Sequence, residues 1–330
     1  MKLNVTYPKI DFSKLKNKTV LITGASGLIG INMLNSIKSV KDEYNITIHT
    51  KTKNSCSMFD DIFSGCNNTI VDESYDEGEE DIKFDCIIHA CGYGQPLKFL
   101  TRKIETLYIN TFHTVKLIEM LKPDGIFLFI SSSEVYNGLI KNEVTEEDIG
   151  ISSIDHPRAA YIEGKRLGEV ICNIYREKFP NIRVARLSLS YGPGTKIGDT
   201  RVVNTLINNG LTRDTIELLD DGTASRTFCY ISDAVEMLWN VALNSKDFIY
   251  NVGGIYTCSI LDLAETIGQC LNKPIVLPEV DRGLEGSPKN VRLSIDKYVK
   301  EFNKYDFVEI EKGVIETIKW QRHLNENEKN

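Results

Sequence analysis

The sequence predicts an α/β fold in which a doubly wound parallel sheet is followed by a smaller α+β lobe. Two observations support this prediction. In the first half of the 330-residue chain, short apolar runs alternate with segments whose apolar residues recur at the period of a helix. After residue 194 this rhythm weakens, and glycine and proline breaks appear in the segment 277–290. We therefore expect a first domain over residues 1–187, with a returning strand and helix near 228–253, and a second lobe over 188–330.

Six strands are expected in the first domain, each marked by a short apolar run such as "TVLITG". The fifth run, "GIFLFI", is apolar throughout, which is typical of a strand buried on both faces of a parallel sheet. The predicted strands are 19–24, 46–50, 68–71, 84–90, 125–131 and 182–190. The predicted helices are 28–40, about 105–121 and 159–178. The segment 72–81 holds seven carboxylates, and such a charge run is typical of a solvated loop.

The composition limits the classes of partner. The chain has 39 Lys and Arg against 46 Asp and Glu, a formal net charge of −7, and no basic stripe, which argues against nucleic acid or an anionic membrane. No apolar run has the length of a membrane span, and the first residues lack the layout of a signal peptide. The eight cysteines contain no C-x-x-C pair, and neither they nor the five histidines cluster at metal-ligand spacing. We expect a cytoplasmic protein with reduced thiols and no metal.

A glycine-rich turn joins the first strand to the first helix. In "TGASGLIG", three glycines allow a tight turn, close approach of the backbone to a pyrophosphate, and close packing of helix on sheet. The helix N-terminus then offers N–H donors and partial positive charge to the phosphates. The sequence therefore predicts a Rossmann-like dinucleotide site. The expected cofactor-binding residues in this turn are Gly24, Ser26, Gly27, Leu28, Ile29 and Gly30; the family resemblance given below adds Ala90, Tyr161 and Lys165.

The residues at the end of the second strand leave open which dinucleotide binds, NAD or NADP. NAD-binding folds usually place an acidic residue there to accept the ribose hydroxyls. This chain has "HTKTKN", with Lys51 and Lys53 and no acid. Such lysines suit a 2′-phosphate, so NADP is a live alternative to NAD.

Serine and glutamate side chains follow the fifth strand at the edge where open α/β sheets bind ligands. Ser132 and Glu134 lie in "FISSSEVYN", and Tyr161 and Lys165 share one face of the next helix, four residues apart. An ammonium and a positive nicotinamide beside the phenol would lower the pKa of Tyr161, so that it could accept a proton from a substrate hydroxyl. The plainer readings are a polar turn with capping serines and an amphipathic helix with an exposed lysine.

With "TGASGLIG", "HACG" and "YIEGK", the chain resembles the short-chain dehydrogenase/reductase superfamily in its extended, sugar-nucleotide branch. The resemblance implies an NAD-dependent enzyme that oxidises C4 of a nucleotide sugar. It implies that Tyr161 is the base, that Ser132 bonds the reacting oxygen and that Lys165 holds the cofactor ribose. Glu134 would act at C5, a step that a simple 4-epimerase does not need. The implied substrate-binding residues are Ser133, Tyr93, Arg201 and Arg226, the two arginines for the diphosphate.

Further segments are similar to UDP-glucuronate decarboxylases. They include "HPRAAYIEGKRLGE", "YGPG" and "DDGTASRTFCYISDAV", and the resemblance runs from about residue 19 to 320. It implies loss of carbon dioxide from a 4-keto intermediate, a UDP-sugar substrate, a homodimer and a role in polysaccharide biosynthesis. The implied substrate lobe is the segment 188–330.

Three departures from this pattern keep other reactions open. Leu189 replaces an asparagine, Gly194 replaces an arginine, and Val291 stands where decarboxylases carry an arginine, with Arg292 one place along. A sugar-nucleotide 4,6-dehydratase, a 4-epimerase and an NADP-dependent ketone reductase are the enzymatic alternatives. A non-catalytic dinucleotide sensor is a further one, although such a protein would not need Tyr161 with Lys165.

Overall fold

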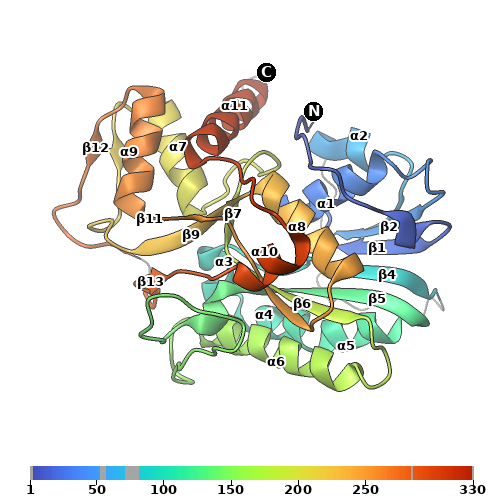
Figure 1. Cartoon of the computed structure of the whole chain (residues 1–330). Helices are drawn as coiled ribbons and strands as arrows, with labels where there is room; N and C mark the ends of the chain where they lie inside the picture. Colours follow the sequence, from blue (N-terminus) through green and yellow to red (C-terminus); the bar gives the residue numbers. More distant parts are fainter. Residues whose placement is uncertain (1–2, 53–56, 71–81, 284, 329–330) are drawn as a thin grey trace.

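The computed structural model describes residues 3–52, 57–70, 82–283 and 285–328. Lys53 and the carboxylate run 72–81 lie outside the described residues. The centre of the molecule is a seven-stranded sheet between two layers of helices (Figure 1). Every pairing in this sheet is parallel. The doubly wound parallel sheet predicted from the sequence is therefore confirmed.

The strand order is β10-β6-β5-β4-β1-β2-β3. The order reverses between β1 and β4, and ligands of open parallel sheets bind outside the carboxyl ends of the strands at such a switch point. The bounds are β1 Thr19–Thr23, β2 Thr47–Thr52, β3 Asn67–Ile70, β4 Phe84–His89, β5 Leu121–Ser132, β6 Ile182–Leu187 and β10 Ile249–Val252.

Helices cover both faces of this sheet because the strands are apolar on both sides. One face carries α1 and α8, which pack on each other, and the other carries α4, α5 and α6 (Figure 1). Their bounds are α1 Leu28–Lys38, α4 Lys103–Asn110, α5 Phe112–Glu119, α6 Ala159–Tyr175 and α8 Ile231–Asn244. Short helices are η1 Ser13–Leu15, η2 Ser57–Phe59, α2 Asp60–Phe63, α3 Pro96–Thr101 and η3 Ser133–Tyr136.

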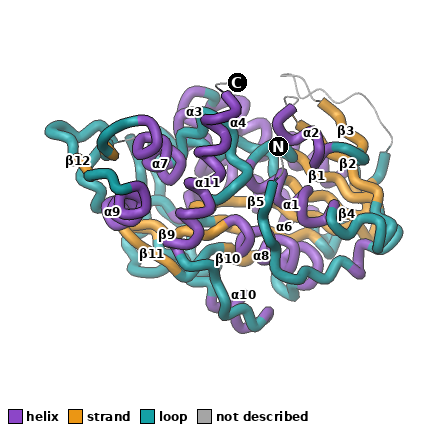
Figure 2. The backbone as a smooth tube through the Cα atoms, turned by 90° about the horizontal axis from the view of Figure 1, so that it is seen from above, coloured by secondary structure: helices purple, strands orange, loops and turns teal. Residues whose placement is uncertain are grey.

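A second group of elements lies beyond the carboxyl ends of β4 to β6. Its sheet has the order β11-β9-β13, with β7 also paired to β9, and a two-stranded sheet joins β8 to β12. Figure 2 shows α7 and α9 gathered at this end of the molecule, away from β1 to β3. The bounds are β7 Leu189–Tyr191, α7 Val202–Thr212, β8 Ile216–Glu217, β9 Ser225–Tyr230, β11 Tyr256–Ser259, α9 Ile260–Leu271, β12 Ile275–Val276, β13 Asn290–Val291, α10 Asp296–Phe302 and α11 Ile310–Glu328.

Two predicted elements are divided in the structure. The predicted strand 182–190 breaks at Ser188: β6 pairs with β5 and β10, whereas β7 pairs with β9 of the smaller sheet. The predicted helix 105–121 breaks at Thr111, whose φ of −120° and ψ of −84° are not helical. A single apolar run or helical period does not reveal such breaks, because the same sequence pattern continues on both sides of each.

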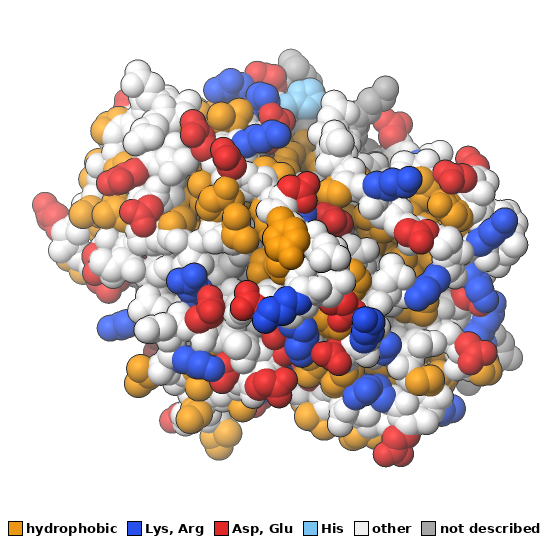
Figure 3. Space-filling model, viewed as in Figure 1, with side chains coloured by type: hydrophobic (Ala, Val, Ile, Leu, Met, Phe, Trp, Pro, Cys, Tyr) orange, Lys and Arg blue, Asp and Glu red, His pale blue; other side chains and the backbone are white. Residues whose placement is uncertain are grey.

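The surface matches the mixed composition. On the face shown in Figure 3, acidic and basic side chains are interspersed. Within the described part of the chain, no helix is both long and apolar enough to cross a membrane.

Candidate active site

A cavity of about 350 Å³ lies between the large sheet and the smaller one. Its walls come from the turns after β4, β5 and β6, from α6 and α7, and from β9 and β13. It brings together residues that are up to 262 positions apart, from Ile29 to Val291. The predicted site residues in its lining are Ile29, Ala90, Ser132, Ser133, Glu134, Tyr161, Lys165, Arg201 and Arg226.

The glycine turn has the geometry of a phosphate cradle. Gly24 has a φ of +63°, and a Cβ there would lie 2.5 Å from the carbonyl oxygen of Ala90. A Cβ on Gly30 would lie 2.3 Å from the carbonyl oxygen of Gly24. Gly27 is the N-cap of α1 and makes no side-chain cap, so the first N–H groups of the helix are available to a ligand. These residues therefore fit the pyrophosphate of a dinucleotide, with Ser26, Leu28 and Ile29 beside them.

Tyr161 and Ser132 meet inside the cavity through a hydrogen bond between their side chains. Ser132 ends β5 and Tyr161 lies in the first turn of α6, where it is 8% exposed. Burial is the largest influence on the phenol and raises its pKa to about 12, while the bond to Ser132 lowers it. In the protein without cofactor, desolvation of the phenolate thus outweighs the nearby positive charges, and the predicted lowering with the positive nicotinamide beside the phenol stays a prediction.

Lys165 is buried one turn after Tyr161. Its Nζ donates a hydrogen bond to the carbonyl oxygen of Ile130 at 2.7 Å and lies 4.9 Å from the centre of the Phe129 ring. Burial lowers its pKa to about 8. Lys165 is thus a buried cation at the floor of the cavity, not the exposed lysine of a surface helix.

A buried ion pair and a hydrogen bond hold α6 against β6 and β5. Glu169, one turn beyond Lys165, accepts a hydrogen bond from Ser131 at 2.6 Å and pairs with Arg186 of β6 at 2.8 Å. Because Ser131 precedes Ser132, this network fixes the serine and the lysine relative to each other.

Glu134 is paired with Arg158, a residue that the sequence reasoning did not single out. Arg158 Nη1 donates to Glu134 Oε1 at 2.5 Å, and Asn137 Nδ2 donates to Oε2 at 3.2 Å. Both carboxylate oxygens are therefore held from the side, with Glu134 in the cavity wall. The motif "HPRAAY" contains this arginine. The contacts of Arg158 with Glu134 and with residues near 286 join distant parts of the chain, so no local sequence pattern indicates them.

The two predicted diphosphate ligands differ in their charge partners. Arg201 forms a two-pronged ion pair with Asp199, with a shortest distance of 2.5 Å. Arg226 donates to the backbone carbonyls of Ser225, Pro288 and Lys289. Burial lowers the pKa of Arg226 to about 10. Arg226 is the better anion ligand, since its charge is not neutralised by a bonded carboxylate.

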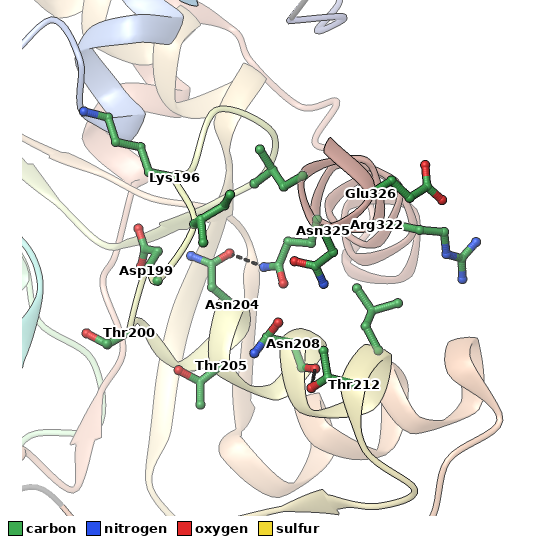
Figure 4. A pocket seen from close by; sticks show the side chains of 15 residues that line it. Lys196, Asp199, Thr200, Asn204, Thr205, Asn208, Thr212, Arg322, Asn325 and Glu326 are labelled. Atoms are coloured by element: carbon green, nitrogen blue, oxygen red, sulfur yellow. Dashed lines mark hydrogen bonds between the residues drawn. The ribbon is translucent and has the colours of Figure 1, made fainter. Parts of the chain in front are cut away.

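Asp199 faces a second cavity of about 890 Å³ between α7 and α11, shown in Figure 4. Thr200 and Thr205 line both cavities. Amide and hydroxyl side chains make up seven of the fifteen residues that line the second cavity, and Gln321 donates to Asn204 at 2.7 Å. It contains none of the predicted site residues.

The remaining predicted residues lie at the margin. Tyr93 is absent from the described cavity lining and receives a hydrogen bond from Arg102 at 3.4 Å. Lys51 lies in β2, paired in register with Thr23 of β1. No group of three or more possible metal ligands occurs among the residues that the structure describes.

The three positions that depart from the pattern of the resemblance, Leu189, Gly194 and Val291, have distinct structural consequences. Leu189 and Val291 line the cavity, and Arg292 is 61% exposed and paired with Glu143 at 3.0 Å outside it. Gly194 has a φ of +110°, and a Cβ there would lie 2.5 Å from Asn32 Nδ2. An arginine at position 194 would therefore need a different packing of α1.

The fold and the site define a dinucleotide-dependent enzyme with a serine, a tyrosine and a lysine at the carboxyl edge of a parallel sheet. The model of the NAD dependent epimerase/dehydratase family matches residues 20–253. The chain belongs to this family, and NAD is its cofactor.

Relatives and solved structures agree with this assignment. The chain is 27% identical to UDP-glucuronic acid decarboxylase 1 of Xenopus tropicalis, over 98% of this chain and 77% of the relative. It is 27% identical to UDP-glucuronic acid decarboxylase 6 of Arabidopsis thaliana, over 84% and 80%. The fold is that of UDP-glucuronic acid 4-epimerase from Bacillus cereus, with a TM-score of 0.76, 20% identity, and coverage of 93% of this chain and 99% of the other. The resemblance predicted from the sequence is confirmed.

Proposed function

We propose that the protein modifies a nucleotide sugar through a 4-keto intermediate, and that the reaction is the decarboxylation of UDP-glucuronate. The observation that carries the proposal is the cluster of Ser132, Glu134, Tyr161 and Lys165 around one cavity. A carboxylate beside the serine and tyrosine gives the site a group that simple 4-epimerisation does not need. The likeness to UDP-glucuronic acid decarboxylases over most of the chain supports the choice of substrate.

The chain's own residues handle the protons and the developing charge. Tyr161 accepts the proton of the C4 hydroxyl, and Ser132 bonds the same oxygen. When bound, NAD supplies the chemistry of taking the C4 hydrogen as hydride and returning it, and its positive charge favours the Tyr161 phenolate.

Decarboxylation then follows from the 4-keto group. The C5–C6 bond breaks, carbon dioxide leaves, and the electron pair passes into the C4 carbonyl as an enolate that Tyr161 and Ser132 stabilise. A proton adds to C5 under the orientation set by Glu134. Tyr161 finally returns its proton to the C4 oxygen as the ketone is reduced. The balance is UDP-glucuronate plus one proton to UDP-xylose plus carbon dioxide, with the cofactor regenerated.

Substrate anchoring is assigned mainly to Arg226. Its buried guanidinium suits the diphosphate. Arg201 can contribute only after its pair with Asp199 rearranges, and Ser133 offers a further hydroxyl in the lining.

A second candidate, 4,6-dehydration of a nucleotide hexose, is favoured by one observation. The residue that faces the cavity at the end of β13 is Val291, whereas Arg292 points outward to Glu143. A sugar with a neutral C6 needs no cation there. Here Glu134 would remove the C5 proton, and water would leave across C5 and C6.

Product analysis by NMR separates these reactions. The protein is incubated with sub-stoichiometric NAD and either UDP-glucuronate or UDP-glucose. A pentose nucleotide from UDP-glucuronate supports decarboxylation, and a 4-keto-6-deoxy sugar from UDP-glucose supports dehydration. Release of oxidised cofactor with a preference for NADPH would instead indicate the ketone reductase.

We also propose a homodimer in the cytoplasm. The outer face of α6 exposes Leu167, Val170 and Ile174, and α4 packs beside it with Ile104 exposed. An apolar face of this kind marks an association surface.

A further inference from the structure

Arg158 connects the two proton-handling groups of the proposed site. Its side chain donates to Glu134 at 2.5 Å, and its backbone carbonyl caps α6 by accepting the N–H groups of Tyr161 and Ile162, both at 3.0 Å. The guanidinium also lies over the Phe99 ring, 5.5 Å from its centre. Phe99 in turn stacks on Tyr161 at 4.4 Å with a 13° angle between the rings. Arg158 and Phe99 thus link Glu134 to Tyr161 through a continuous set of side-chain contacts.

Each of the three nitrogens of the Arg158 guanidinium donates a hydrogen bond. Nη2 donates to Ser287 Oγ at 2.5 Å and Nε to the carbonyl oxygen of Glu285 at 3.4 Å, while the side chain is only 4% exposed. Arg158 lines the cavity, but its charge is already matched by the Glu134 carboxylate at 2.5 Å, which makes it a poor ligand for a substrate anion. Its contacts instead hold Glu134 from one side and the segment 285–288 from the other.

The position of Glu134 therefore depends on Arg158. The carboxylate accepts hydrogen bonds from the side chains of Arg158 and Asn137, and of these two only the arginine brings a charge. Asn137 also donates to the carbonyl oxygen of Gly286, so the same cluster joins the turn after β5 to the segment that covers the cavity. Without Arg158, nothing charged among these contacts keeps the carboxylate in the cavity wall.

We propose that Arg158 is a positioning residue that aims Glu134 at C5 of the substrate. It acts through Glu134 and touches neither the sugar nor the cofactor. The inference rests on the proposed 4-keto chemistry, and it applies equally to decarboxylation and to dehydration because both need a C5 proton transfer.

The test separates the C4 step from the C5 step. Wild type, Arg158→Gln, Arg158→Lys and Glu134→Gln, each loaded with NAD, are mixed in D₂O with UDP-glucuronate and, separately, with UDP-glucose. Absorbance of the reduced nicotinamide reports C4 oxidation, and NMR reports deuterium entry at C5. Arg158→Gln should oxidise C4 within about threefold of wild type but lose about 10²-fold in C5 deuteration, the usual scale for a displaced catalytic group. Reduced nicotinamide should then accumulate.

Three comparisons with wild type and Arg158→Gln test the inference further. The double variant of Glu134→Gln with Arg158→Gln should be no slower at C5 than either single variant, since the two residues act as one unit. Arg158→Lys, which keeps the charge but not the planar fork, should fall between Arg158→Gln and wild type. Arg292→Gln is the matched control, an arginine paired with a glutamate outside the cavity, and should change neither rate.

The outcomes separate a failure of the inference about Arg158 from a failure of the proposed function. An active wild type with unchanged C5 deuteration in Arg158→Gln, or with equal losses in both steps, overturns the inference alone. A wild type that oxidises neither sugar overturns the proposed function and the inference together.

Discussion

At the residue scale, the proposed reaction depends on Ser132, Tyr161 and Lys165 and on the buried contacts that hold them. Ser132 is predictable from its place at the end of a strand, and Tyr161 and Lys165 from their spacing on one face of a helix. The structure places all three in the lining of one cavity. Arg158 reaches Ser287 across 129 positions of the chain, a contact that no local pattern encodes. The pair of Asp199 with Arg201 is local, yet a spacing of two residues in a loop does not predict which way either side chain turns.

Tyr161 should be essential for turnover. Tyr161→Phe removes the hydroxyl that accepts the C4 proton and should lower kcat by about 10³-fold, within the range of general acid–base catalysis. Because the ring and its stacking on Phe99 remain, NAD affinity should change by less than about threefold. Steady-state kinetics with calorimetric NAD titration checks this. Unchanged turnover in Tyr161→Phe would remove Tyr161 from the mechanism.

Lys165 should lower the stability of the protein at neutral pH. Its pKa is depressed from 10.5 to about 8 by burial, so between these values the unfolded chain binds the extra proton and stability rises with pH. Lys165→Met should therefore raise the free energy of unfolding at pH 7 by roughly 2 kcal/mol, after the lost hydrogen bond to Ile130 is subtracted.

Urea unfolding of the cofactor-free protein at pH 7 and pH 9.5 measures this effect. The gain of Lys165→Met over wild type should shrink toward the higher pH, because the neutral lysine carries no desolvation penalty. A gain that is constant across this range, or a loss at pH 7, would contradict the assignment of a buried cation.

At the element scale, the turn between β1 and α1 depends on one glycine conformation. Gly24→Ala must adopt a φ of +63° with its Cβ 2.5 Å from the Ala90 carbonyl oxygen. We expect a loss of roughly 2–4 kcal/mol in the free energy of unfolding and a weakened NAD affinity. Gly94→Ala is the control, since a Cβ there meets nothing within 4 Å. Denaturant melts of both variants give the comparison, and equal stability of the two would refute the cradle geometry.

The same scale shows where sequence periodicity stops being informative. The strands of the large sheet follow from apolar runs because parallel strands are buried on both faces. The passage from β6 to β7 leaves that sheet for the smaller one within a single residue, Ser188. That change is set by pairing with β9, almost 40 positions later in the chain, and the apolar pattern before and after it is alike.

At the scale of the whole molecule, the account predicts a dimer through α4 and α6. Val170→Glu combined with Ile174→Glu places two charges on side chains that are 51% and 62% exposed in the single chain. Sedimentation should show a dimer for wild type and a monomer for this variant. Ile140→Glu, on a fully exposed loop position, should leave the dimer intact. A wild-type monomer at micromolar concentration would contradict this prediction.

The two groups of elements meet at the cavity, and the proposed reaction needs residues from both. The most direct measurement is NMR of UDP-glucuronate deuterated at C4, incubated with the protein and sub-stoichiometric unlabelled NAD. We expect a pentose nucleotide that keeps deuterium at C4, because the hydride removed from C4 is returned to the same sugar. UDP-glucuronate returned unchanged by a protein that has bound NAD, or a product whose C4 deuterium is lost, would contradict it.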